Sequence, residues 1–176
     1  MGKKHKPRLK KGLKEVEKPL YLNANLIYSE ALNYIKKPYW KRNIKTGTLT
    51  KLKNEGYGLV TSILTRMEIM QRLHREENKT SSYSRRLYTQ ILQDYEIAEI
   101  IPIEDHIPLN VAFIDAIGCS KLDFKDALHL TIARKLKMPV CTHDKKFRGD
   151  FSQHEAKKNF YERVFKPEEL IKPKKK

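Results

Sequence analysis

Residues 121–144 read KLDFKDALHLTIARKLKMPVCTHD, and this stretch predicts a helix followed by a buried strand. The pattern indicates the helix over residues 124–136, and the short apolar run at residues 139–142 indicates the strand. Asp126 lies early in the helix, and Asp144 comes just after the strand. In parallel α/β sheets the active crevice lies beyond the carboxyl ends of the strands, so Asp144 stands where a functional side chain is expected.

The same alternation of strands and helices extends along the rest of the chain. Residues 19–22 are apolar and end at Asn23, which predicts a buried strand, and apolar side chains then recur at helical spacing up to Pro38. Further strands are expected at residues 59–62 and 99–103, and helices near residues 48–55, 64–73, 82–97 and 108–118. This order predicts an α/β fold, a three-layer α/β/α sandwich with a mainly parallel central sheet.

The chain is strongly basic. Its 176 residues include 37 Lys plus Arg against 21 Asp plus Glu, a formal net charge of +16. Residues 1–19 contribute +6 and residues 166–176 contribute +3, which leaves +7 for the body between them. An excess of this size indicates a polyanionic partner, nucleic acid ahead of an acidic membrane surface. A simpler interpretation of the tails is a solubilising surface without a partner.

Length and composition indicate one soluble domain. We expect a basic disordered arm at residues 1–18, the folded domain at residues 19–171 and a basic tail at residues 172–176. Only Cys119 and Cys141 are present, which argues against a disulfide scaffold or a four-ligand zinc module. The N-terminus lacks the apolar stretch of a signal peptide, and no run approaches the roughly 20 apolar residues of a membrane span. We therefore expect a cytoplasmic protein without a membrane partner.

Four polar side chains are candidates for a shared site: Asn23, Glu68, Asp126 and Asp144. Asn23 and Asp144 each follow a predicted strand, and the carboxyl ends of parallel strands meet at one edge of a sheet. Carboxylates held close together repel one another, so a cluster of them usually binds a divalent cation. All-oxygen ligands suit Mg²⁺ or Mn²⁺, which can activate water and offset the charge that develops on a phosphate.

Five strings in chain order resemble the PIN domain and, within it, the VapC-like toxin ribonucleases. They are YLNANLI, TSILTRMEI, KLDFKDALHLTIARKL, MPVCTHDKKF and VFKPEELI, and together they span about residues 20–171. The resemblance implies the PIN form of the α/β/α sandwich and a nuclease that cleaves RNA phosphodiesters with Mg²⁺ or Mn²⁺. It also implies RNA as substrate, a small protein antitoxin as partner and a homodimer.

The resemblance assigns the family's catalytic and metal-binding positions to Asn23, Glu68, Asp126 and Asp144. The first motif, aspartate–x–asparagine, falls on Asn23 and Asn25, so this chain departs from the family at its first acidic position. An amide offers a metal its oxygen without a charge, which implies weaker binding of the ion. The resemblance therefore implies one of two functions. The chain is either an impaired metal-dependent ribonuclease, engineered or natural, or a catalytically silent PIN domain that binds RNA or a ribonucleoprotein.

Further positions are candidates with competing structural interpretations. Asp123 could be an accessory metal ligand one turn before the third acidic position, or the N-cap of its helix. Tyr39, Trp40 and Arg42 could stack on unpaired bases or be partly buried under a loop. The candidates for substrate binding are Asn25, Thr142, Trp40 and Arg42.

Side chains near the four positions also have structural interpretations. Asn25 is expected to N-cap the first helix rather than to contact substrate. Glu68 could pair with Arg72, four residues further along the same helix. His129 and His143 lie beside acidic positions but are expected as core side chains or as partners of the ligands, not as metal ligands.

The basic arm leads to a testable prediction. If the arm and the body bind phosphates, the logarithm of the RNA-binding constant falls steeply with the logarithm of salt concentration, and removing residues 1–18 makes this slope shallower. Each phosphate contact on a single strand contributes about 0.7 to the slope. Fluorescence anisotropy of a labelled RNA over a salt series measures both slopes. Equal slopes would show that the arm makes no phosphate contact, and salt-independent binding would remove nucleic acid as the partner.

Overall fold

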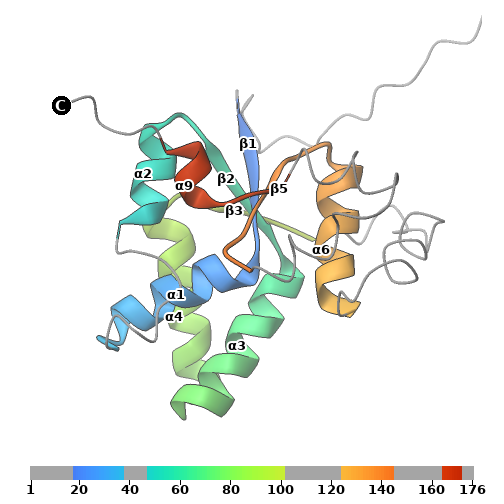
Figure 1. Cartoon of the computed structure of the whole chain (residues 1–176). Coiled ribbons are helices and arrows are strands. Elements are labelled where there is room, and N and C mark those ends of the chain that lie inside the picture. Colours follow the sequence, from blue (N-terminus) through green and yellow to red (C-terminus); the bar gives the residue numbers. More distant parts are fainter. Residues whose placement is uncertain (1–17, 38–46, 102–123, 145–163, 172–176) are drawn as a thin grey trace, which may run out of the picture.

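The computed structural model describes residues 18–37, 47–101, 124–144 and 164–171 (Figure 1). The strands are β1 (Pro19–Leu22), β2 (Gly58–Ser62), β3 (Ala98–Ile100), β4 (Val140–Cys141) and β5 (Val164–Phe165). The helices are α1 (Ala24–Tyr34), α2 (Thr48–Asn54), α3 (Ile63–Glu77), α4 (Ser81–Asp94), α6 (Phe124–Lys135) and α9 (Pro167–Leu170). The described residues exclude the helix expected at residues 108–118, most of both tails, and Asp123, Trp40 and Arg42.

Five strands form one sheet in the order β3-β2-β1-β4-β5, and every neighbouring pair is parallel. β1 lies in the middle, with Leu20 opposite Leu59 of β2 and Leu22 opposite Cys141 of β4. The α/β prediction is therefore confirmed, and in the described residues the sheet is parallel throughout. The apolar pair Val164–Phe165 forms a fifth strand, which is not among the strands expected from the sequence.

The two faces of the sheet carry separate cores because successive side chains of a strand point to opposite faces. Leu20 and Leu22 belong to the cluster with α1, α2, α3 and α4. Tyr21 and Val60 belong to the cluster with α6. Figure 1 shows α6 on one side of the sheet and α1 and α2 on the other, which makes the three layers of the sandwich. Within the described ranges, no helix has both the length and the apolar character to cross a bilayer.

A polar cluster fastens β3 to the helices beside it. Arg66 of α3 pairs with Glu99 through two guanidinium nitrogens, one of them at 3.0 Å from the carboxylate. The hydroxyl of Tyr88 in α4 donates to the same carboxylate at 2.9 Å. Tyr88 is 1% exposed, so its hydroxyl is satisfied by Glu99 in the interior. This cluster fixes the outer strand of the described sheet against α3 and α4.

The central position of β1 predicts a large stability effect there. Leu20→Ala removes a side chain with no exposed surface and should lower the free energy of unfolding by about 2–5 kcal/mol. Met67→Ala on α3 is the matched control, since Met67 is 63% exposed and its loss should change stability by no more than about 0.5 kcal/mol. Urea denaturation followed by circular dichroism measures both. Similar losses for the two variants would contradict the placement of β1 in the core.

Candidate active site

The candidate site lies where the strand order changes direction. From β1 the chain adds β2 and β3 on one side, while β4 and β5 lie on the other side. Ligand crevices of open parallel sheets form at this switch point, outside the carboxyl ends of the strands. Asn23 leaves β1 here, and its backbone N–H donates to the carbonyl of Cys141 in β4 at 3.1 Å. The ends of β1 and β4 are thus joined at the predicted crevice.

Asn23 is the N-cap of α1. Its Oδ1 accepts the backbone N–H of Asn25 at 3.1 Å, and the residue is only 5% exposed. The expectation that Asn25 would be the cap is wrong, because α1 begins at Ala24 and the cap residue precedes the helix. The cap bond determines the orientation of the Asn23 amide. If the amide were flipped, its Nδ2 would face the backbone N–H of Asn25, and both groups are donors. The Nδ2 of Asn23 is buried and has no hydrogen-bond partner among the residues that the structure describes.

Asn25 ties α1 to the turn that follows β4. Its Nδ2 donates to Oγ1 of Thr142 at 3.0 Å, and its Oδ1 accepts the backbone N–H of His143 at 3.5 Å. The same Thr142 oxygen accepts the backbone N–H of Asp144 at 3.1 Å. Thr142 therefore orders the main chain at Asp144, and these bonds bring Asn23, Asn25, Thr142 and Asp144 together at one edge of the sheet.

Glu68 lies on α3 and contacts α6. Its Oε1 lies 2.8 Å from Nε2 of His129, and its side chain is 20% exposed, so solvent reaches it. Pairing of Glu68 with Arg72 is not observed, because Arg72 bonds instead to Glu76, at 2.9 Å. Asp126 lies one turn before His129 on α6. Glu68 thus contacts His129 from α3, while Asp126 lies three residues before this histidine on α6.

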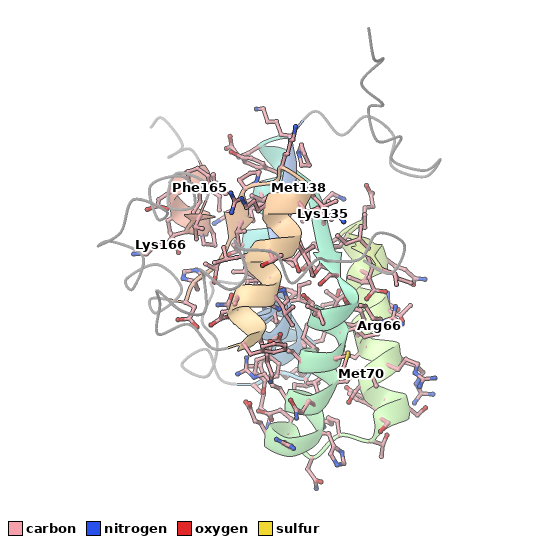
Figure 2. The ribbon with its side chains drawn as sticks, turned by 90° about the vertical axis from the view of Figure 1, so that its right-hand side faces the viewer. Arg66, Met70, Lys135, Met138, Phe165 and Lys166 are labelled. Carbon is pink, nitrogen blue, oxygen red and sulfur yellow. The ribbon has the colours of Figure 1, made fainter. Side chains whose placement is uncertain are left out.

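Figure 2 shows how α6 and α3 lie relative to the sheet. Lys135 and Met138 mark the C-terminal end of α6, and Arg66 and Met70 mark α3 beside it. The opposite, N-terminal end of α6 contacts α3, where Lys125 donates to Gln71 at 3.4 Å. The two helices therefore meet at the end of α6 that carries Asp126.

Tyr21 and Ser62 in this region were missed by the sequence reasoning, and both are reached through His129. His129 is fully buried, and its Nδ1 lies 2.6 Å from the hydroxyl of Tyr21 in β1. That hydroxyl lies 2.8 Å from Oγ of Ser62, the last residue of β2. Burial raises the pKa of Tyr21, so its hydroxyl stays protonated at neutral pH. The expectation that His129 is a core side chain rather than a ligand agrees with its full burial.

His143, the residue before Asp144, faces α9. Its Nε2 lies 3.2 Å from Oε1 of Glu168. Burial lowers the pKa of His143, and the Glu168 carboxylate partly offsets this effect. The ring is thus directed toward a carboxylate outside the four candidate positions.

The candidate residues match a divalent cation in part. Glu68, Asp126 and Asp144 carry the hard oxygen ligands that Mg²⁺ and Mn²⁺ prefer. Asn23 is a weaker match, because its oxygen already accepts the cap bond and carries no charge, and its other terminal atom is a hydrogen-bond donor. Among the residues that the structure describes, no three His, Cys, Asp or Glu side chains are grouped closely enough to hold a metal ion.

An all-parallel α/β/α sandwich with hydrogen-bonded polar side chains at its switch point is the class of fold that this chain adopts. The family model of the PIN domain matches residues 29–149, which is more than half of the chain, and the chain belongs to the PIN domain family. PIN domains are generally metal-dependent nucleases that act on RNA, so membership indicates a nuclease-related or RNA-related function. A comparison with curated proteins finds no match.

The bond between Asn25 and Thr142 can be tested by a double-mutant cycle. Asn25→Ala and Thr142→Val each remove one partner, and each should lower the free energy of unfolding by about 1 kcal/mol. The double variant should lose less than the sum, with a coupling of about 0.5–1.5 kcal/mol, because the shared bond is lost only once. Urea denaturation of the four proteins gives the coupling. Additive losses would show that Asn25 does not stabilise the turn after β4.

Proposed function

We propose that this chain is a VapC-like endoribonuclease that hydrolyses RNA phosphodiesters with Mg²⁺ or Mn²⁺, and that Asn23 keeps its activity low. Membership of the PIN family supports the reaction class. The observation that carries the proposal is the buried Nδ2 of Asn23, which has no partner in the described part of the chain and lies at the end of β1 beside the turn of Asp144. A carboxylate at position 23 would offer an anionic oxygen in place of this donor.

In this proposal Glu68, Asp126 and Asp144 hold the ion. When bound, the ion lowers the pKa of a water molecule and offsets the negative charge of the phosphate. The protein's own part is to present the carboxylates from separate elements. Glu68 comes from α3, Asp126 from α6, and Asp144 from the turn that Thr142 orders. The net charge of +16 supports RNA as the substrate, since it attracts a polyanion.

A catalytically silent RNA-binding domain is the second candidate function. The donor on Asn23 favours it, because an N–H group can bond a phosphate oxygen directly whereas it cannot ligate a cation. In this alternative the crevice binds the RNA backbone, or that of a ribonucleoprotein, without cutting it. The two candidates differ in what an aspartate at position 23 would do.

The VapC-like assignment extends to partners. We include in the proposal a small protein antitoxin and a homodimer, both implied by the family resemblance. The exposed apolar side chains of Met67 on α3 and Phe124 on α6, 63% and 60% accessible, support a protein partner near these helices. Light scattering after size-exclusion chromatography of the full chain would test the dimer, which a monomeric mass would contradict.

Asn23→Asp should create or greatly raise RNA cleavage that depends on Mg²⁺ or Mn²⁺. Aspartate is as good an N-cap as asparagine, so α1 should be retained while the crevice gains a carboxylate. Without metal the variant should be slightly less stable, because the acidic groups repel one another. A metal concentration of 100 times its dissociation constant should raise stability by about 2.7 kcal/mol. A labelled RNA pool on a denaturing gel and a thermal melt with and without metal measure these effects.

Three controls accompany this variant. Asn54→Asp adds the same charge at an exposed residue that ends α2, and it should not create cleavage. Adding EDTA, or combining Asn23→Asp with Asp126→Ala, should abolish the cut, and a cut that survives Asp126→Ala would identify a contaminating nuclease. A folded Asn23→Asp protein that cuts nothing would reject the nuclease proposal in favour of the silent RNA-binding domain.

A further inference from the structure

Four side chains from four elements form a hydrogen-bonded series that ends at Glu68. Oγ of Ser62 in β2 lies 2.8 Å from the hydroxyl of Tyr21 in β1. That hydroxyl lies 2.6 Å from Nδ1 of His129 in α6, and Nε2 of His129 lies 2.8 Å from Oε1 of Glu68 in α3. Ser62, Tyr21 and His129 have no exposed surface, so only the glutamate end of the series reaches solvent.

The direction of each hydrogen bond follows from the chemistry at the two ends. A carboxylate of Glu68 can only accept, so Nε2 of His129 donates to it. In a neutral imidazole the other nitrogen must then accept, and the Tyr21 hydroxyl donates to it. Burial raises the pKa of Tyr21, which keeps this donor protonated. The phenol oxygen is left to accept from Ser62.

We propose that Tyr21 and His129 are positioning residues that hold the Glu68 carboxylate in place for a bound ion. Oε1 of Glu68 is taken by His129, and no described residue hydrogen-bonds its Oε2. The anchor thus leaves one carboxylate oxygen for a ligand. This inference rests on the proposed function, because the position of Glu68 affects an ion only if Glu68 binds one.

The physical reason for such an anchor is the freedom of the glutamate side chain. A free glutamate loses rotamer entropy when it binds an ion, and a carboxylate that is already restrained loses less. Partners that orient a ligand in this way typically change metal affinity by about 10–100-fold when they are removed. The restraint here is rigid because the fully buried His129 is bonded at both ring nitrogens.

The series also has a purely structural interpretation, in which it only satisfies buried polar groups. Tyr88 gives the matched comparison. It is equally buried, and its hydroxyl donates to Glu99 at 2.9 Å, outside the candidate site. Tyr21→Phe and Tyr88→Phe each remove one buried hydroxyl, so they should have similar effects on stability. Only the first should change metal binding if Tyr21 acts through Glu68.

The test measures binding of Mn²⁺ alone to the full chain carrying Asn23→Asp, by electron paramagnetic resonance. Tyr21→Phe should weaken Mn²⁺ binding about tenfold, and His129→Leu by about 10–100-fold. His129→Gln keeps an N–H donor and should recover most of the loss. In a chain that carries Glu68→Gln, Tyr21→Phe should have no further effect. An equal effect with and without Glu68, or a loss of the same size from Tyr88→Phe, would overturn the proposal.

A second measurement on the metal-free chain keeps the test decisive if a variant does not fold. Long-range ¹H–¹⁵N spectra should show His129 as the Nε2–H tautomer in the parent protein, and an Nδ1–H tautomer would overturn the proposal. If Asn23→Asp binds Mn²⁺ and cuts RNA while Tyr21→Phe and His129→Leu leave the affinity unchanged, the positioning inference fails and the proposed function stands. If Asn23→Asp binds no Mn²⁺, both fail.

Discussion

Strand β1 is paired along both edges, with β2 on one side and β4 on the other, and both of its faces are buried. Because side chains alternate along a strand, Leu20 and Leu22 enter the core with α1 while Tyr21 enters the core with α6. A shift of one residue in this register would reverse every one of these directions. The hydrogen bonds of β1 set its register. They therefore determine which side chains enter each core of the sandwich and which polar groups lie at the carboxyl end of the strand.

The same strand connects two groups of polar side chains that come from distant parts of the sequence. Its carboxyl end delivers Asn23 beside the turn of Thr142 and Asp144. Two residues earlier, Tyr21 begins the contacts that lead through His129 to Glu68. Glu68 on α3 and the main-chain turn after β4 are thereby both positioned by contacts that lead back to strand β1. Polar groups from four elements therefore have defined positions relative to one another.

The sequence alone predicted the helices and strands with long apolar patterns, such as α3 and α6, because their burial follows their periodicity. It did not predict the cap of α1, since Asn23 and Asn25 are equally suitable caps and only the first helical residue decides between them. A spacing of four residues along α3 allows Arg72 to pair with either Glu68 or Glu76. A tertiary contact distinguishes them: Arg72 lies 3.6 Å from the ring centre of Tyr28, whose hydroxyl bonds Glu76.

The two terminal side-chain atoms of residue 23 have different roles. One caps α1, and the other determines the chemical character of the position. The oxygen that caps α1 is present in both asparagine and aspartate, so the start of the helix does not select between the two residues. The choice concerns the other atom, which is buried. As an amide nitrogen it is a donor without a partner among the described residues, which costs about 1–3 kcal/mol, and as a carboxylate oxygen it would be a buried charge. A ligand with an anionic oxygen would accept a hydrogen bond from the amide and offset the first cost. A bound cation would offset the second cost, that of the carboxylate charge. The identity of residue 23 therefore changes the charge and the hydrogen-bonding character of one buried atom while leaving the cap of α1 unchanged.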